Sequence, residues 1–161
     1  MNRIAIFPGS FDPFTRGHEQ IVDATLSLFD SVVIAVGSNV QKCGLLPVDE
    51  RRRLIEELYA DEPRVETTTY SGLTGDVARE FGACAIIRGV RGVVDFEYER
   101  MLDANNRRLF EGLQTVVLFA PSEMMHISSS AIRELLAFGR SVEEYLPEGV
   151  DLNRYLSTKT E

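Results

Sequence analysis

Four short stretches of the chain are hydrophobic almost without interruption, and this feature constrains the fold more than any other. They cover residues 4–7, 32–36, 83–87 and 115–119, and a weaker fifth run covers residues 64–68. A strand with one face in water alternates between apolar and polar residues, whereas a strand covered on both faces is apolar throughout. These runs therefore predict the strands of a parallel sheet.

Segments with helical spacing of apolar residues separate these runs. We expect helices at about residues 17–29, around 77–81, and at about 94–110 and 128–138. Another helix, capped by Asp49, would carry Leu54, Ile55 and Leu58. An interrupted helical stretch is expected at 142–156. Alternation of strand and helix is typical of right-handed βαβ units. The predicted fold class is therefore α/β: a Rossmann-like, doubly wound, five-stranded parallel sheet with a C-terminal helical extension. A length of 161 residues predicts a single domain over residues 1–161.

The charge balance limits the partners that we expect. The chain has 17 basic and 25 acidic residues, a net charge of −8. Such a surface repels polyphosphate backbones and anionic lipid, so we expect no nucleic-acid partner and no membrane partner. No apolar window approaches the roughly 20 residues of a membrane span, and the first residues do not resemble a signal peptide. Cys43 and Cys84 lack metal-binding spacing, and Cys84 is expected to be buried in its apolar run. These features predict a reduced, cytoplasmic protein.

The loop after the first strand carries the first candidate motif. Residues 7–18 read FPGSFDPFTRGH. Gly9 allows a ligand to approach the backbone closely, and Ser10 adds a hydroxyl group. Gly17 and His18 would lie in the first turn of the following helix, where unpaired N–H groups and the helix dipole attract phosphate. By itself the Gly–His pair would also suit an ordinary turn in which His18 caps the helix.

Two further motifs follow later strands. Ile127 and the serines at positions 128–130 open the helix after the fifth strand, where hydroxyl groups can cap the helix or donate to a phosphate. The sequence IRGVR, which includes Arg88 and Arg91, follows the fourth strand, and DFEYE, from Asp95 to Glu99, opens the next helix. Two buried guanidinium groups need anionic partners, so we expect an anionic ligand there. Pairing of the two arginines with the acidic residues of DFEYE is the alternative.

Together these motifs resemble those of the phosphopantetheine adenylyltransferases, in the nucleotidyltransferase superfamily with a T/H-x-G-H motif. The resemblance extends from Ile4 to about Leu146 and includes Lys42, which matches the family's substrate-binding lysine. The chain departs from the family's usual pattern at the sequence MMH of residues 124–126, at the residues that follow Lys42, and at Ser10, where threonine is frequent.

The resemblance implies transfer of AMP from ATP to 4′-phosphopantetheine, giving dephospho-coenzyme A and pyrophosphate. It also implies Mg²⁺ with ATP, a homohexamer, and coenzyme A as a feedback inhibitor. His18 would stabilise the transition state, and no residue of the chain would be a resident metal ligand. The implied ATP-binding residues are Ser10, Phe11, His18, Gly89, Val90, Arg91, Glu99, Met124, Met125, His126, Ile127, Ser128, Ser129 and Ser130. The implied phosphopantetheine-binding residues are Ser10, Lys42, Leu73, Thr74 and Arg88.

Two other interpretations remain at this point. One is a sister transferase of the same superfamily, of the nicotinamide-mononucleotide adenylyltransferase or glycerol-phosphate cytidylyltransferase type. The other is a nucleotide-binding regulatory module without catalysis. The arginine motif and DFEYE argue against the first, and the intact set of His18, Lys42, Arg88, Arg91 and Ser129 argues against the second.

Overall fold

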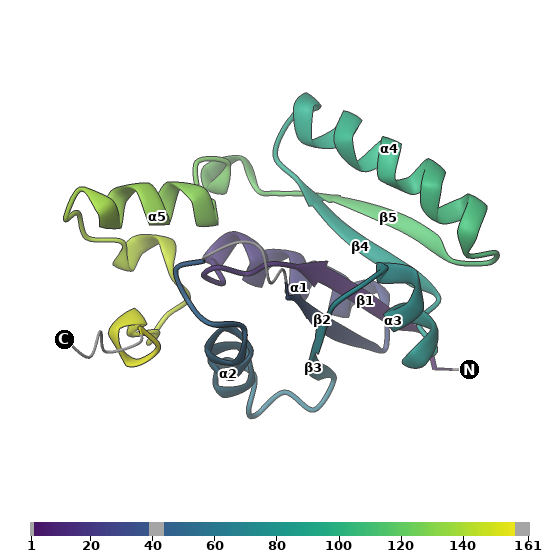
Figure 1. The fold of residues 1–161 in the computed structure, drawn as a ribbon, viewed down its shortest axis with the longest axis horizontal. Coiled ribbons are helices and arrows are strands. Elements are labelled where there is room, and N and C mark those ends of the chain that lie inside the picture. The colour runs from purple at the N-terminus through teal and green to yellow at the C-terminus, as the bar shows by residue number, and fades with distance from the viewer. Residues whose placement is uncertain (1, 39–43, 157–161) are drawn as a thin grey trace.

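A five-stranded parallel sheet forms the centre of the structure, a computed structural model that describes residues 2–38 and 44–156 (Figure 1). The strand order is β3-β2-β1-β4-β5, and every neighbouring pair is parallel. The strands are β1 (Ile4–Gly9), β2 (Ser31–Gly37), β3 (Val65–Tyr70), β4 (Ala85–Val90) and β5 (Gln114–Phe119). All five apolar runs are strands, which confirms the predicted α/β fold class.

Helices cover both faces of the sheet. They are α1 (Arg16–Leu28), α2 (Val48–Leu58), α3 (Thr74–Glu80), α4 (Val93–Leu109) and α5 (Ser129–Ala137). One hydrophobic core joins β1 and β2 to α1, α2, α5 and the C-terminal residues. A second core lies on the opposite face and joins the same strands to α3 and to the chain just after α4. This arrangement brings the loops after β1 and β4 together at the carboxyl edge of the sheet, which is where open α/β sheets bind ligands.

The structure corrects three local predictions. Pro47, not Asp49, is the N-cap of α2, and Asp49 lies in the first turn, where a carboxylate favours the helix dipole. The C-terminal extension contains two short 3₁₀ turns, Glu143–Tyr145 and Leu152–Arg154, in place of a longer interrupted helix. Cys84 is exposed because it precedes the first paired residue of β4.

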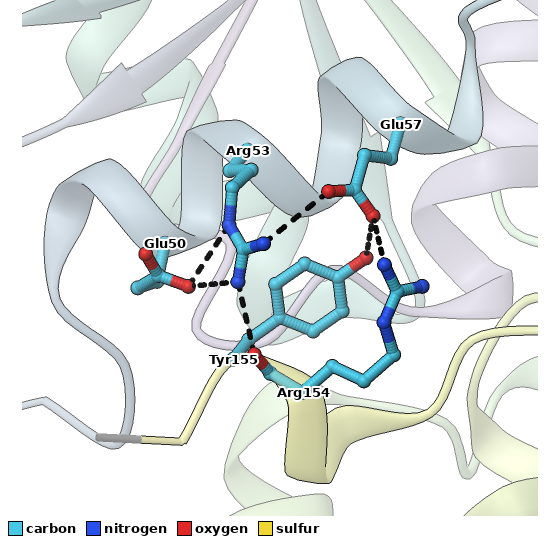
Figure 2. A network of polar contacts seen from close by, with 5 residues as sticks. All are labelled: Glu50, Arg53, Glu57, Arg154 and Tyr155. Atoms are coloured by element: carbon cyan, nitrogen blue, oxygen red, sulfur yellow. Dashed lines mark hydrogen bonds and ion pairs between the residues drawn. The ribbon is translucent and has the colours of Figure 1, made fainter. Parts of the chain in front are cut away.

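A polar network fixes the C-terminal extension on α2 (Figure 2). The hydroxyl of Tyr155 donates to Glu57 Oε2 at 2.6 Å, and Arg154 pairs with the same carboxylate at 3.0 Å. Arg53 pairs with Glu50 and donates to the carbonyl of Arg154 at 2.9 Å. Tyr155 is buried, and burial together with its bond to Glu57 raises its pKa to about 12. The extension is therefore part of the main core and closes one side of α2.

None of the helices within the described ranges is both long enough and apolar enough to cross a membrane.

Candidate functional site

A cavity of about 360 Å³ lies at the carboxyl ends of β1 and β4, between the first turns of α1 and α5. It brings together three motifs that are far apart in the sequence. The predicted site residues that line it are Ser10, Phe11, His18, Arg88, Gly89, Arg91, Glu99, Ile127, Ser128, Ser129 and Ser130. The three motifs come together because the strands that precede them, β1, β4 and β5, are neighbours in the sheet.

His18 both caps α1 and lines the cavity. The Thr15 side chain accepts from the His18 backbone N–H at 3.2 Å, and His18 Nδ1 accepts from the Thr15 backbone N–H at 3.0 Å. This reciprocal pair is a capping box. Because Nδ1 is an acceptor, the hydrogen-bond pattern assigns the proton of the neutral ring to Nε2. The capping role therefore orients the ring and leaves Nε2–H as its donor.

Three phenyl rings surround the imidazole of His18. The ring centroids of Phe11, Phe14 and Phe7 lie 5.0, 5.3 and 6.2 Å from the imidazole centroid. This burial lowers the pKa of His18 from 6.5 to about 4, and the positive charge of Arg91 acts in the same direction. His18 is therefore a neutral hydrogen-bond donor at pH 7, not a cation.

The backbone of the first loop is shaped around Phe11. Phe11 has a positive φ of 47°, which is unfavourable for a residue with a side chain. This conformation tucks its ring against Gly9, where an added Cβ would lie 2.8 Å from the ring atom Cζ. Gly9 is thus required by the packing of the loop itself. Strained backbone of this kind is found at ligand-binding sites, where surrounding contacts hold it in place.

Donors from α2 and α5 hold the carbonyl groups of this loop. Arg51 Nη1 donates to the Ser10 carbonyl at 2.6 Å and to the Gly37 carbonyl at 3.1 Å. Arg133 Nη1 donates to the Asp12 carbonyl at 2.7 Å. The Ser129 hydroxyl donates to the next carbonyl, that of Pro13, at 2.8 Å. The serine motif therefore stabilises the first loop as well as opening α5.

Sequence reasoning missed Arg51 and Arg133. Arg133 follows Ser130 by three positions, and its Nη2 donates to the Ser130 hydroxyl at 3.1 Å on the same face of α5. That helical spacing was a usable signal. Arg51 gave none, because two of its acceptors, Ser10 and Gly37, lie 41 and 14 residues away in the sequence.

Each arginine of the β4 motif has a carboxylate partner within the chain. Arg88 forms a two-pronged ion pair with Glu99, in which Nε and Nη2 each lie 2.6 Å from a carboxylate oxygen. Arg91 Nε lies 3.3 Å from Asp95 Oδ2. The structure thus shows the alternative pairing with the acidic residues of DFEYE, and binding of an anionic ligand by these two guanidinium groups stays a prediction.

A second cavity of about 430 Å³ adjoins the first and has Leu73 and Thr74 in its wall. It lies between the start of α3 and the inner face of α4. Pro8, Arg88 and Glu99 line both cavities. The two predicted contacts to the pantetheine arm thus lie in the cavity that Arg88 borders.

Four predicted residues are not brought to the first cavity. Met125 is exposed, and His126 packs edge-on against the Tyr145 ring at 5.6 Å, in a separate cleft. Met124 ends a 3₁₀ turn and does not line the first cavity, and neither does Val90, which is buried. Lys42, the remaining predicted contact, lies outside the described residues.

Within residues 2–38 and 44–156, no three His, Cys, Asp or Glu side chains gather closely enough to hold a metal ion. The carboxylates that border the first cavity, Asp95 and Glu99, are engaged by Arg91 and Arg88. The donor set of this site therefore does not fit a resident metal ion.

Comparison with solved structures shows that other proteins share this fold. A bifunctional NMN adenylyltransferase/ADP-ribose pyrophosphatase from Francisella tularensis superposes with a TM-score of 0.69, at 16% identity over 94% of this chain and 46% of that one. A putative nicotinate-nucleotide adenylyltransferase from Vibrio parahaemolyticus gives 0.60, at 21% identity over 91% and 94% of the two chains. Residues 6–135 match the cytidylyltransferase-like family, which is the class that the fold and the site define.

Curated relatives narrow this class. The phosphopantetheine adenylyltransferase of Porphyromonas gingivalis is 51% identical over 93% of this chain and 97% of its own length. That of Phocaeicola vulgatus is 47% identical over 94% and 99% of the two chains. The chain belongs to the phosphopantetheine adenylyltransferase family, which confirms the resemblance of its motifs.

Proposed function

We propose that this chain is the enzyme that transfers AMP from ATP to 4′-phosphopantetheine, giving dephospho-coenzyme A and pyrophosphate, the penultimate step of coenzyme A biosynthesis. Relatives that bear the name of this activity match the chain over nearly its full length. The structural observation that carries the proposal is the pair of adjoining cavities that share Arg88. One cavity suits the phosphates of a nucleotide, and the other suits a long arm that ends in a phosphate.

The chemistry needs no nucleophile from the protein. An oxygen of the acceptor phosphate attacks the α-phosphorus of ATP and forms the new P–O bond. The bond from the α-phosphorus to the bridging oxygen breaks, and pyrophosphate leaves with that electron pair. The protein contributes positioning and stabilisation of charge.

His18 would donate its Nε2–H to the phosphate group under attack. The capping box fixes the ring and leaves Nε2–H as the donor on its free edge. A donor that is already oriented stabilises charge without the cost of reorienting water. This supports the role of transition-state stabiliser.

The phosphate groups of ATP would lie between the first turns of α1 and α5. Arg91 and the serines at positions 128–130 border that space, where helix N–H groups favour anions. Ser10, Lys42 and Arg88 would hold the acceptor phosphate, and Leu73 and Thr74 would contact the arm in the second cavity. The contacts of Phe11, Gly89, Val90, Glu99 and residues 124–127 with ATP stay predictions.

Mg²⁺ would enter with ATP as part of the substrate. Since the described residues offer no fitting donor set, the phosphate oxygens and water would be its main ligands. The ion would offset the negative charge of the leaving pyrophosphate.

The remaining proposals concern assembly and regulation. Val93, Val94 and Met101 on α4 and Phe119 on β5 are large, exposed apolar residues, which supports burial against further copies of the chain in a homohexamer. Coenzyme A contains the pantetheine arm, so the second cavity would accept it as a feedback inhibitor. We further propose one domain over residues 1–161 and a cytoplasmic location.

Release of pyrophosphate with different acceptors tests the proposed function. In separate reactions the purified protein would be given Mg²⁺, ATP and either 4′-phosphopantetheine, nicotinamide mononucleotide or glycerol 3-phosphate. Glycerol 3-phosphate would also be tested with CTP. We expect release with 4′-phosphopantetheine alone. Release with either other acceptor and none with 4′-phosphopantetheine would replace the proposal by the corresponding sister activity.

A further inference from the structure

The Arg88–Glu99 ion pair lies in the wall between the two cavities. The pair and Pro8 border both of them. Glu99 holds the Nε and Nη2 edge of the guanidinium, and Nη1 donates to the Pro8 carbonyl at 3.1 Å. The guanidinium is therefore held from two directions, and these three bonds use three of its five N–H groups.

Glu99 is an unusual member of α4. It is the buried residue of that helix, and its side chain is 8% exposed, against 25% for that of Arg88. Other carboxylates of α4 pair with arginines at the surface, such as Glu97 with Arg100 at 3.7 Å. A buried carboxylate within 2.6 Å offsets much of the positive charge that Arg88 presents to a ligand.

In the proposed reaction, partial neutralisation of Arg88 by Glu99 would affect how tightly the acceptor phosphate is bound. The acceptor phosphate is a dianion before attack and has lost negative charge once it is joined to the α-phosphorus. An uncompensated cation beside it would therefore stabilise the ground state more than the transition state. Binding energy of that kind tightens substrate binding without accelerating the chemical step.

We propose that Glu99 is a positioning residue that acts through Arg88: it orients the guanidinium between the two cavities and offsets its charge, so that the acceptor phosphate is aligned without being bound too tightly. This proposal rests on the proposed function. It gives Glu99 a role on the acceptor side of the site, in addition to its predicted contact with ATP.

The test replaces Glu99→Gln, which removes the charge and keeps a similar shape. We expect the variant to bind 4′-phosphopantetheine about tenfold more tightly in titration calorimetry, ~1.4 kcal/mol, because one negative charge is removed from beside Arg88. We expect kcat to fall by about tenfold or more. Glu97→Gln is the matched control, since it removes an exposed carboxylate from the same helix and should change neither quantity.

A second variant separates charge from orientation. Glu99→Asp keeps the charge but is too short to hold both nitrogens, so the affinity for 4′-phosphopantetheine should stay within about twofold while kcat falls. A purely structural role for Glu99 would instead lower the affinity in both variants, in step with their melting temperatures. Equal or weaker acceptor binding by a folded Glu99→Gln variant overturns the proposal. If Glu99→Gln does not fold, Glu99→Asp decides the question. An unchanged kcat in Glu99→Asp, or a change only in its affinity for ATP, overturns the proposal.

Inorganic phosphate provides a readout that does not depend on the proposed function. Titrated without ATP, it should bind Glu99→Gln more tightly than the unaltered protein, and Arg88→Ala more weakly. If the unaltered protein does not use 4′-phosphopantetheine but these phosphate affinities change as stated, the proposed function fails and the offset of Arg88 by Glu99 stands. If turnover occurs and the phosphate affinities do not change in these directions, this inference fails alone.

Discussion

Replacement of His18 by alanine should lower kcat far more than it weakens ATP binding. In the structure Nδ1 is used by the Thr15 N–H, so the ring has one donor, Nε2–H, for a ligand. Loss of one such preorganised donor typically costs about 10²–10³-fold in kcat, or roughly 2.7–4 kcal/mol of transition-state stabilisation. The change also removes half of the capping box, which should cost about 1 kcal/mol of stability.

The assay is steady-state release of pyrophosphate at saturating 4′-phosphopantetheine with ATP varied. Ser27→Ala, near the end of the same helix, is the control for a general effect on α1, because Ser27 is exposed and its hydroxyl donates to the Ala24 carbonyl within the helix. The melting temperature of each variant shows how much of any loss is unfolding. A near-normal kcat with a raised KM for ATP would refute the assigned role and make His18 a binding residue.

The same histidine should make stability depend on pH. Its pKa is 6.5 in the unfolded chain and about 4 in the folded one. The unfolded chain therefore takes up this proton first, so the contribution of His18 to the free energy of unfolding is complete above pH 6.5 and is lost as the pH falls towards 4. Urea unfolding of the unaltered protein should weaken over that window more steeply than that of His18→Ala. Parallel curves would contradict the burial of the ring.

Other substitutions test the remaining parts of the site and fold. Arg88→Ala should weaken binding of 4′-phosphopantetheine and Arg91→Ala that of ATP, each by on the order of 2–5 kcal/mol in titration calorimetry; the reverse pattern would mean that the two cavities are assigned the wrong way round. Gly75→Ala should cost about 1–3 kcal/mol in urea unfolding, because its Cβ would overlap the ring of Phe110, and unchanged stability would contradict that packing. Cys84→Ser should leave kcat within about twofold, since the thiol is exposed and the attacking group belongs to the substrate; a folded but inactive variant would argue for a cysteine in the mechanism.

The sequence predicted the sheet well because a strand that is buried on both faces is apolar throughout. Uninterrupted apolar runs marked β1, β2, β4 and β5, and even the weaker run of β3 paired as expected. Helix ends were less predictable. Asp49 has the right chemistry for a cap, but Pro47 sets the backbone angle that starts α2. The backbone angles of one residue can determine where a helix begins, whereas a strand is indicated by the apolar pattern of all its residues.

Within the site, motif residues on the first turns of helices were placed well, and residues on irregular backbone were not. His18 and Ser129 lie at helix starts whose direction the sheet determines. Met125 and His126 follow a 3₁₀ turn that directs them away from the first cavity, and no sequence period reports such a turn. The Pro8 carbonyl that Arg88 contacts and the Ser10 carbonyl that Arg51 contacts lie 80 and 41 residues away in the sequence. The acidic residues of DFEYE were foreseen as partners of the arginines, but the sequence does not show which distant backbone carbonyl a guanidinium contacts.

Labelled oxygen in the acceptor phosphate shows whether that phosphate itself attacks the α-phosphorus of ATP. 4′-Phosphopantetheine carrying ¹⁸O on its phosphate would be converted with unlabelled ATP and Mg²⁺, and both products would be analysed by mass spectrometry. Direct attack by that phosphate on the α-phosphorus predicts dephospho-coenzyme A that retains all of the label, with none in the pyrophosphate. Label in the pyrophosphate, or no labelled dephospho-coenzyme A at all, would rule out direct attack by the acceptor phosphate.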